Sequence, residues 1–327
     1  MARLDSAALA PAVARFLGVG VVVGETRRVS GGASRETWLF DATSSDGVTH
    51  ALVLRRDPGA FAGQTDRATE YGLLAAAAAA GVPVPTVRLL LEPGDNLGSG
   101  FVMDRIEGET IPRKILRDEQ YAGARTEMAA ACGTIAARLH ATPVAGLPAL
   151  AVQGAAAQLD QWTQILDTFG EPHPAFELGA RWMRERIPCG PPAPVLVHGD
   201  YRNGNFIVGP EGIRAVLDWE LAHLGDPIED LGWLCARAWR FGVDRVVGGF
   251  GDVSDLLDAY EAAGGARPDL DTLRFWVALA TFKWGVMCLI QAFTHLNGLV
   301  RSVELAAIGR RVVENEWDLL TIVDGGW

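Results

Sequence analysis

The sequence predicts an α+β fold in two lobes, a small antiparallel sheet followed by a large helical lobe. Short apolar runs at the N-terminal end give the order β-β-β-α-β-β, and from about Pro112 apolar residues recur at helical spacing. A sheet layer followed by a helical layer leaves a natural cleft between the two. We place the boundary after residue 106, which gives an N-terminal lobe of residues 1–106 and a C-terminal lobe of residues 107–327.

The N-terminal lobe is expected to begin with a helix that ends before a glycine and to continue with strands. The helix covers Ser6–Leu17, and a second, alanine-rich helix runs from Thr65 to Ala80, where Gly81 and two prolines follow it. A turn at Ser44–Gly47 joins the second and third strands. The predicted strands are Glu25–Val29, Thr37–Asp41, His50–Arg55, Thr86–Leu91 and Gly100–Ile106.

The C-terminal lobe is expected to consist of long helices with a few short strands between them. Helical spacing covers Glu119–Ala141, Ala155–Phe169, Pro174–Ile187, Ile228–Phe241, Val253–Ala263, Leu270–Phe293 and Ser302–Ile322. The short strands are Val195–Val197, Phe206–Val208 and Arg214–Leu217. Leu273–Phe293 is the most membrane-like stretch, but Arg274 and Lys283 interrupt it, so we expect a buried helix there.

Composition narrows the class of protein. Of 327 residues, 49% are hydrophobic and 21% charged, which is typical of a globular protein. The net charge of −11 argues against nucleic acid or an anionic membrane as partner, and mildly favours a cationic or neutral substrate. Four cysteines without a CxxC pair and no signal-peptide pattern in Met1–Leu17 predict a reducing, cytoplasmic location.

The strongest functional pattern is His-Gly-Asp-Tyr-Arg-Asn-Gly-Asn at 198–205, followed thirteen residues later by Asp218. This pattern of residues and spacings is typical of a kinase catalytic loop. We predict Asp200 as the catalytic base that positions the attacking hydroxyl, and Asn205 and Asp218 as ligands of Mg²⁺ on the ATP phosphates, since both are hard oxygen donors. Each residue alone could be a turn residue, so their combined spacing carries the prediction.

Two further residues of this loop have weaker assignments. Arg202 stands two positions after the base, where an arginine could neutralise charge on the transferred phosphoryl group, or could be a solvated loop residue. His198 is expected to tie the loop to neighbouring backbone rather than to shuttle protons.

A loop of small residues between two predicted strands is a candidate phosphate-binding segment. It consists of Ser30, Gly31, Gly32, Ala33 and Ser34. Small residues let backbone N–H groups approach phosphates closely, although the segment matches neither Walker A nor GxGxxG and could be a plain hairpin loop.

The remaining nucleotide contacts are predicted on the sheet and its helix. Arg55, at the end of the third strand, is expected to contact the α- and β-phosphates and to pair with Glu70, while Arg56 faces the other side of the strand. The alternative is a surface pair of arginines. Near Met103, the backbone C=O of Asp104 and N–H of Ile106 are expected to contact the adenine edge.

The segment Gly225–Leu231 opens a helix rather than contributing chemistry. Asp226 is suited to cap it, with Pro227 in the first turn, and acidic residues there favour the helix dipole. We expect Asp226 and Asp230 to be structural and to brace the catalytic loop.

Taken together, these residues resemble the aminoglycoside phosphotransferase and choline-kinase-like family of small-molecule kinases. Within that family, the segments Ser-Gly-Gly-Ala-Ser at 30–34 and Asp-Trp-Glu-Leu-Ala at 218–222 of this sequence look most like kinase domains related to certain acyl-CoA dehydrogenases. The resemblance implies a protein-kinase-like fold, ATP or GTP as donor, Mg²⁺, and a hydroxyl acceptor on a small molecule. The residues that carry it are Ser30–Ser34, Val53–Arg56, Glu70, His198–Asn205, Asp218–Glu220 and Gly225–Pro227.

The sequence departs from regulated protein kinases in four places. Gly199 stands where they carry the arginine of His-Arg-Asp, Asp218-Trp219-Glu220 replaces Asp-Phe-Gly, and Asp226 follows too closely for a long activation segment. Arg55 replaces the usual lysine. These departures make a protein kinase the less favoured alternative, while a catalytically silent nucleotide- or metabolite-binding protein is a second one.

The acceptor is not readable from the sequence, and neither is the oligomeric state. An aminoglycoside predicts an acidic pocket, choline an aromatic cage, and a hydroxyacyl-CoA an apolar slot with a basic rim. Tryptophans in the helical lobe could belong to that pocket but are more often core residues. They are Trp162, Trp233, Trp239, Trp276 and Trp284.

Overall fold

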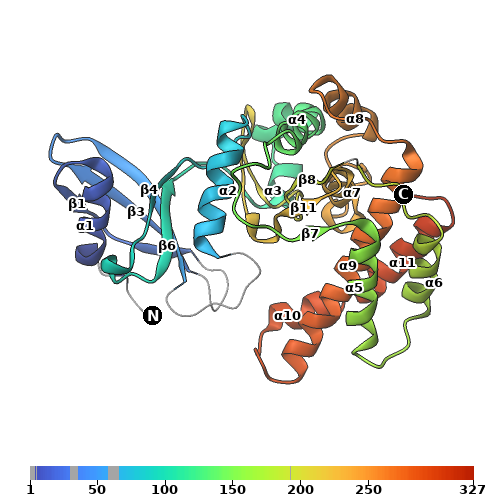
Figure 1. Ribbon diagram of the computed structural model, residues 1–327. Helices are drawn as coiled ribbons and strands as arrows, with labels where there is room; N and C mark the ends of the chain where they lie inside the picture. The colour runs from blue at the N-terminus through green and yellow to red at the C-terminus, as the bar shows by residue number, and fades with distance from the viewer. Residues whose placement is uncertain (1–3, 5, 30–35, 58–65, 192) are drawn as a thin grey trace.

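The predicted α+β class is confirmed. The computed structural model describes residues 4, 6–29, 36–57, 66–191 and 193–327, and shows a sheet lobe beside a larger helical lobe (Figure 1). The N-terminal lobe contains helix α1 (Ser6–Leu17), six strands and helix α2 (Arg67–Ala79). Its strands are β1 (Val21–Val23), β2 (Arg27–Val29), β3 (Glu36–Ser44), β4 (Thr49–Asp57), β5 (Val87–Leu90) and β6 (Ser99–Asp104).

The six strands form one antiparallel sheet in the order β1-β3-β4-β6-β5, with β2 also pairing with β3. The tight turn predicted between β3 and β4 is present: Gly47 has a φ of 86° and its N–H donates to the carbonyl of Ser44 at 2.8 Å. A positive φ is accessible to glycine without strain, which explains its place there.

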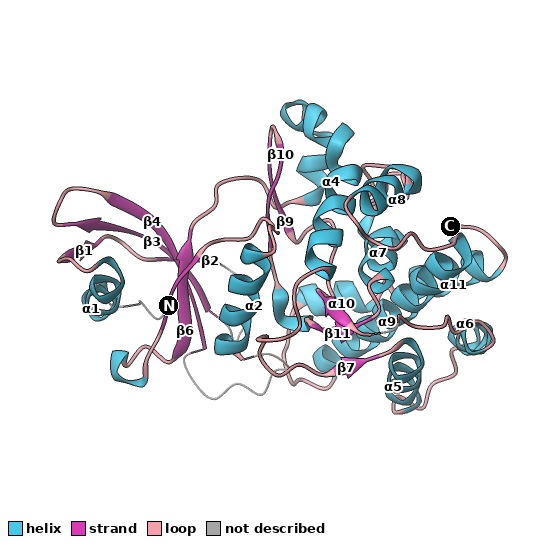
Figure 2. Cartoon of the chain, turned by 45° about the horizontal axis from the view of Figure 1, so that its top comes forward, coloured by secondary structure: helices cyan, strands magenta, loops and turns pink. Residues whose placement is uncertain are grey.

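Helices cover both faces of this sheet (Figures 1 and 2). Strand alternation sends Leu52 and Leu54 toward the core that includes α1, and Val53 between them toward the core that includes α2. The second core continues without a break into the helical lobe. Helix α2 therefore packs between the sheet and the rest of the molecule, which fixes Glu70 on it relative to both lobes.

The helical lobe is built around α9 (Leu270–Leu296), most of which is buried. Helix α9 is long and apolar enough to pass a length-and-composition test for a membrane span, but 78% of its most apolar window is buried inside the protein, as expected for a core helix. The other helices are α3 (Pro112–Arg117), α4 (Ala122–His140), α5 (Ala155–Asp167), α6 (Pro174–Arg184), α7 (Ile228–Cys235), α8 (Val253–Ala262), α10 (Val303–Gly309) and α11 (Val312–Val323).

Two small sheets in the helical lobe flank the loop formed by residues 198–205. Strands β9 (Phe206–Gly209) and β10 (Gly212–Val216) form a hairpin, and β11 (His223–Gly225) lies between β7 (Val152–Gln153) and β8 (Val195–Val197). Residues 198–205 connect β8 to β9. The chain therefore leaves one small sheet, crosses the predicted catalytic loop and enters the other.

Two predicted helices are interrupted in the structure. The helix expected over Ile228–Phe241 ends at Cys235, where the Arg240 side chain donates to the Cys235 carbonyl at 2.8 and 3.2 Å, and a 3₁₀ turn (Arg237–Trp239) follows. The helix expected over Ser302–Ile322 is split near Gly309, where a Cβ would lie 2.6 Å from the Ala292 side chain of α9. Periodicity alone signals neither break, because both depend on tertiary contacts. Strands β1, β7 and β11 and helix α3 were not predicted.

Candidate active site

The loop 198–205 depends on a glycine at its second position. Gly199 has a φ of 77°, and a Cβ there would lie 2.4 Å from the Leu221 carbonyl oxygen. A side chain is therefore excluded both by backbone conformation and by space. This accounts for Gly199 in place of the arginine of His-Arg-Asp: the loop packs directly on the segment after Asp218.

The carboxylate of Asp200 receives three side-chain hydrogen bonds. Its Oδ1 accepts from Arg202 Nε at 2.9 Å and from Trp233 Nε1 at 2.7 Å, and its Oδ2 accepts from Asn205 Nδ2 at 2.6 Å. The side chain is 15% exposed. These three donors hold the carboxylate in one orientation.

Asn205 and Asp218 lie at the adjoining open ends of the β9–β10 hairpin. Phe206 pairs with Val216, and the Leu217 N–H donates to the Asn205 carbonyl at 2.8 Å, so both side chains project from the same end. Asn205 Nδ2 also donates to the Asp200 carbonyl at 2.9 Å, which leaves the amide oxygen as its free metal-ligating atom.

This donor set suits Mg²⁺. An amide oxygen and a carboxylate are hard ligands, and Mg²⁺ normally keeps water and phosphate oxygens for its remaining positions. Among the described residues, no group of three or more His, Cys, Asp or Glu side chains forms a metal cluster, so an all-protein metal cage is not seen there. The pair fits a metal that a nucleotide helps to hold.

Asp218 adopts a backbone conformation that few residues with a side chain adopt. Its φ and ψ are 68° and 63°, in the left-handed region. Such strain persists where surrounding structure enforces it, and it is concentrated at functional sites. Trp219 next to it is fully buried against the His198 ring, with centroids 4.8 Å apart, and its Nε1 donates to the Val216 carbonyl. The buried indole anchors the turn, leaving the Asp218 side chain 44% exposed.

Arg55 connects the two lobes. Its Nη1 lies 2.9 Å from Glu70 Oε1 on α2, and its Nη2 lies 3.2 Å from Asp218 Oδ1. Burial works against its charge, but the carboxylates of Glu70 and Asp218 raise the pKa of Arg55 above its ordinary value. The predicted pairing with Glu70 is thus present, with a further contact to Asp218. Arg56 points elsewhere and pairs with Glu36 at 2.9 Å.

A second arginine shares Glu70. Arg67, 1% exposed, donates to Glu70 Oε2 at 2.5 Å and to Asp57 Oδ1 at 3.0 Å. Neither Arg67 nor Asp57 was predicted from the sequence. Their spacing to Glu70 was visible, since Arg67 and Glu70 are three residues apart on a helix, but nothing in the sequence marked Arg67 as buried.

The structure gives less information about the other residues that were predicted to contact the nucleotide. Ser30–Ser34 fall outside the described residues. Met103 is buried in the core on the α2 side of the sheet, and the Asp104 carboxylate accepts from Arg88 at 2.6 and 2.7 Å. Adenine contacts through the Asp104 carbonyl and the Ile106 N–H stay a prediction.

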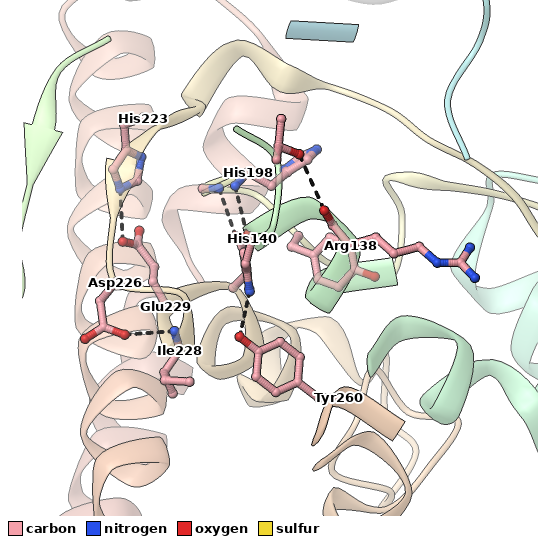
Figure 3. Close-up of polar contacts among 12 residues, drawn as sticks. Arg138, His140, His198, His223, Asp226, Ile228, Glu229 and Tyr260 are labelled. Atoms are coloured by element: carbon pink, nitrogen blue, oxygen red, sulfur yellow. Dashed lines mark hydrogen bonds and ion pairs between the residues drawn. The ribbon is translucent and has the colours of Figure 1, made fainter. Parts of the chain in front are cut away.

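Asp230 supports the loop 198–205 through hydrogen bonds, as predicted. Its two carboxylate oxygens accept from the N–H groups of His198 and Gly199 at 2.8 and 2.9 Å. It is fully buried, and although burial alone raises the pKa of Asp230, its hydrogen bond and charge interaction with His140 bring the pKa below the usual value. His140 in turn contacts Tyr260 Oη at 2.9 Å (Figure 3).

The hydrogen bonds of His198 define its neutral form. Nε2 faces the Leu217 carbonyl at 2.9 Å and must donate, while Nδ1 accepts from the Asp200 N–H at 3.2 Å. Burial lowers the pKa of His198, which agrees with a neutral ring. His198 therefore ties the loop to the backbone, as expected. Nearby, Asp226 accepts from the Ile228 N–H at the start of α7 (Figure 3), but the N-cap is Pro227, so the prediction of Asp226 as the cap and Pro227 as the first helical residue is wrong by one position.

Trp233 is the site residue that sequence reasoning placed least well. Tryptophans of this lobe were interpreted mainly as core, yet the Trp233 indole donates directly to Asp200. Behind it, buried Lys283 lies 4.8 Å from the ring centroid and 3.6 Å from Glu229. Arg202, whose phosphate-contacting role stays a prediction, stacks on Trp239 with its Cζ 4.3 Å from the ring centroid.

Comparison with known proteins identifies the family. Residues 25–276 match the phosphotransferase enzyme family, so most of the chain is covered. The chain belongs to this family. It is 29% identical over 298 residues to acyl-CoA dehydrogenase family member 10 of Mus musculus and 28% identical over 284 residues to family member 11 of Gallus gallus. These matches cover 83% and 79% of this chain but only 27% and 35% of the relatives, so the chain spans about a third of their length or less.

Solved structures share the protein-kinase-like fold. A Ralstonia eutropha protein provisionally named an aminoglycoside phosphotransferase aligns with a TM-score of 0.76 at 23% identity, over 98% of this chain and 99% of that one. Spectinomycin phosphotransferase, solved with ADP and spectinomycin, gives 0.67 at 14%, over 98% of each chain. A choline/ethanolamine kinase family protein of Mesorhizobium loti gives 0.60 at 22%, over 92% and 93%. At these identities the likeness shows the fold.

Proposed function

We propose that this phosphotransferase moves the γ-phosphoryl group of ATP or GTP to a hydroxyl of a small molecule, with Mg²⁺ bound at Asn205 and Asp218. The observation that carries the proposal is the convergence of Asp200, Asn205 and Asp218 at one end of a hairpin, with Arg55 reaching them from the sheet lobe. Solved relatives in complex with ADP or AMP-PNP and an antibiotic support a nucleotide donor and a small-molecule acceptor.

In this proposal each residue has a separate task. Asp200, held by its three donors, orients the acceptor hydroxyl and takes its proton as the bond to phosphorus forms. Arg55 exchanges its contact with Asp218 for the nucleotide phosphates while Glu70 keeps it in place. Bound Mg²⁺ would neutralise charge on the phosphate oxygens. Arg202, beside Asp200, is placed to balance charge on the group in transfer.

The direct test is Asp200→Asn. The variant should bind ADP and Mg²⁺ with little change, because Asp200 is not a proposed metal ligand, and should lose phosphoryl transfer by about a hundredfold to ten-thousandfold. Transfer is measured by coupled ADP release in a screen of hydroxylated metabolites and antibiotics, and binding by calorimetry. Asp271→Asn is a matched control, since that side chain is 93% exposed.

The outcomes separate the alternatives. Full transfer by Asp200→Asn would remove Asp200 from the mechanism. Nucleotide binding by the wild type without ADP release on any acceptor would favour a silent nucleotide-binding protein. Transfer to generic protein substrates in preference to small molecules would favour a protein kinase, for which the short segment between Asp218 and Asp226 provides little support.

A further inference from the structure

An open cleft in the helical lobe lies directly behind the catalytic loop. Its volume is about 930 Å³, within the range of small-molecule sites, and its walls come from the start of α3, the segment 237–244 and the first half of α11. Four arginines line it: Arg113, Arg237, Arg240 and Arg311. This arginine-lined cleft was not anticipated from the acidic net charge of the chain.

Contacts join the cleft to the proposed catalytic base. Arg202, which donates to Asp200, stacks on Trp239, and the two neighbours of Trp239 in sequence line the cleft. On another wall, the Cγ of Pro112 lies 3.4 Å from the position that a Cβ on Gly204 would occupy. The cleft therefore borders residues that contact the loop 198–205.

Arg240 is the unusual member of the cleft. It is 3% exposed, and its guanidinium donates from Nε and Nη2 to the single Cys235 carbonyl. Within the described part of the chain, no carboxylate lies in ion-pair distance of it. A buried cation without a paired anion is costly, and here the burial lowers the pKa of Arg240. Buried charges in folded proteins are usually paired, so an anionic ligand would supply the partner that Arg240 lacks.

The acidic residues of the cleft do not remove this excess. The lining includes Asp244, Glu314 and Asp318, but Glu314 lies 2.9 Å from Arg311 and Asp318 lies 3.6 Å from Arg237. Two of the three carboxylates are thus paired with arginines of the same cleft. Arg113 and Arg240 remain to face a ligand, and Asp244 is the one lining acid that is not paired with an arginine of the cleft.

The backbone of the cleft is also strained. Phe241, next to Arg240, has a φ of 49° and is one of three non-glycine residues with positive φ in the described chain; Asp218 is another. A bulky residue in this region is a genuine outlier and is held there by its surroundings. The strained residue turns the chain between Arg240 and the cleft residues that follow it. The apolar side chains of Val313 and Trp317 also line the cleft.

From these observations we infer that the arginine-lined cleft binds a negatively charged group, phosphate or carboxylate, of the acceptor whose hydroxyl reaches Asp200. The inference rests on the proposed phosphotransfer and names its substrate class: an anionic hydroxyl compound with an apolar portion. Arginine forks match both anions by paired hydrogen bonds. Of the acceptors considered from the sequence, a polycationic aminoglycoside is the least compatible with this cleft.

Calorimetry with hexyl phosphate tests the inference, in the presence of saturating ADP and Mg²⁺ so that the nucleotide site is filled. Heptanoate is the carboxylate arm, and hexylamine and hexanol are the cationic and neutral controls. We expect the phosphate or the carboxylate to bind and the amine not to bind. Arg240→Gln should weaken the anion by about tenfold or more, and exposed Arg113→Gln by a smaller factor, since charge-assisted hydrogen bonds are lost.

Arg310→Gln is the matched control, because Arg310 is exposed and adjacent to Arg311 but does not line the cleft; its affinity should not change. Arg113→Gln guards against a folding defect in the buried Arg240 variant. Equal binding of amine and phosphate, no binding of either anion, or unchanged affinity in both cleft variants would each overturn the inference. None of these outcomes requires turnover, so the result is independent of the Asp200→Asn test.

Discussion

Two buried polar networks hold the candidate site, one in each lobe, and they neutralise charge in different ways. In the sheet lobe, Asp57, Arg67, Glu70 and Arg55 form a chain of alternating formal charges. In the helical lobe, the Asp230 carboxylate is surrounded by two backbone N–H groups and His140. One network consists of ion pairs between side chains, and the other holds a single carboxylate with two backbone N–H groups and one histidine.

The difference teaches which part of the site can respond to a ligand. The Asp230 network is closed, since its carboxylate is fully buried and its hydrogen bonds go to the loop it supports. The other network ends at Arg55, which is 14% exposed and contacts Asp218 across the lobes. We therefore expect the Asp230 network to be rigid scaffolding, and Arg55 to be the member that changes partner when a nucleotide binds.

The largest effect is expected from Asp230→Ala. The change leaves the His198 and Gly199 N–H groups and His140 without their shared acceptor in a dry interior. Breaking a buried charged contact of this kind costs about 3–5 kcal/mol. We expect that loss in the free energy of unfolding, measured by urea denaturation, together with loss of phosphoryl transfer.

Asp271→Ala serves as its control, since Asp271 is 93% exposed and contacts one arginine at 3.3 Å. That variant should unfold within about 0.5 kcal/mol of the wild type. If Asp230→Ala unfolds like the control, the carboxylate is not the support of the loop, and the distinction between a closed and an open network fails.

The next effect separates the two arginines that share Glu70. Arg67→Lys should reduce stability by about 1–3 kcal/mol, because lysine cannot reproduce the fork between Asp57 and Glu70 in a buried position. It should leave the affinity for ADP and Mg²⁺ nearly unchanged. Arg55→Lys should show the opposite pattern, with a modest stability change and an affinity altered by about tenfold.

Calorimetry and urea denaturation of both variants provide the comparison. Protein kinases carry a phosphate-contacting lysine on the third strand of the sheet lobe, so either direction of the affinity change would assign phosphate contact to this side chain. An unchanged affinity in Arg55→Lys, or an equally large change in Arg67→Lys, would contradict the assignment of Arg55 as the mobile end of its network.

A smaller and purely catalytic effect is expected from Trp233→Phe. Phenylalanine keeps the ring beside Lys283 but removes the indole donor to Asp200. A hydrogen bond to a charged group contributes about 1.5–3 kcal/mol, so kcat should fall by about tenfold to a hundredfold while the fold is preserved. Steady-state kinetics separate kcat from KM, and Trp239→Phe, whose Nε1 has no partner within the described residues, is the matched control.

The sequence located the proposed catalytic and metal-binding residues better than the residues that hold them in position. Asp200, in the loop before β9, lies beside Asn205 and Asp218 at the end of the β9–β10 hairpin because the spacing of the three residues in the chain is short, so a local pattern was enough. Arg55 and Glu70 were also found, since a strand end and the following helix lie close together by topology. The α+β class followed from the same periodicities.

The roles of Arg67, Trp233 and Arg240 could not be predicted from the sequence, and the cause is physical. Each has a role defined by burial and by a partner distant in sequence or on another element, and an arginine or tryptophan looks the same in sequence whether it faces solvent or a carboxylate. The net charge of −11 gives no indication of the arginine-lined cleft, because it averages the whole surface, whereas a cleft responds to the side chains that line it.

The smallest expected effect concerns pH and again contrasts two buried groups. Burial lowers the pKa of His198, so below about pH 6.5 the unfolded chain takes up a proton that the folded chain refuses, and stability falls as the pH falls. His223 is also buried, which opposes its charge, but Glu229 at 3.0 Å raises its pKa. Its contribution is complete below about pH 6.5 and is lost as the pH rises through the raised value.

Urea denaturation between pH 5 and 8 tests this contrast with His198→Gln and His223→Gln, because glutamine can place a nitrogen near each Nε2. Removing one titrating group changes the slope of the free energy of unfolding by at most about 1.4 kcal/mol per pH unit. The Asp318 carboxyl, whose pKa burial raises to about 6, titrates in the same range but is common to all three proteins. Relative to wild type, His198→Gln should flatten the decline on the acid side and His223→Gln the decline on the alkaline side. Changes of the same sign in both variants would show that the two networks do not treat a buried histidine differently.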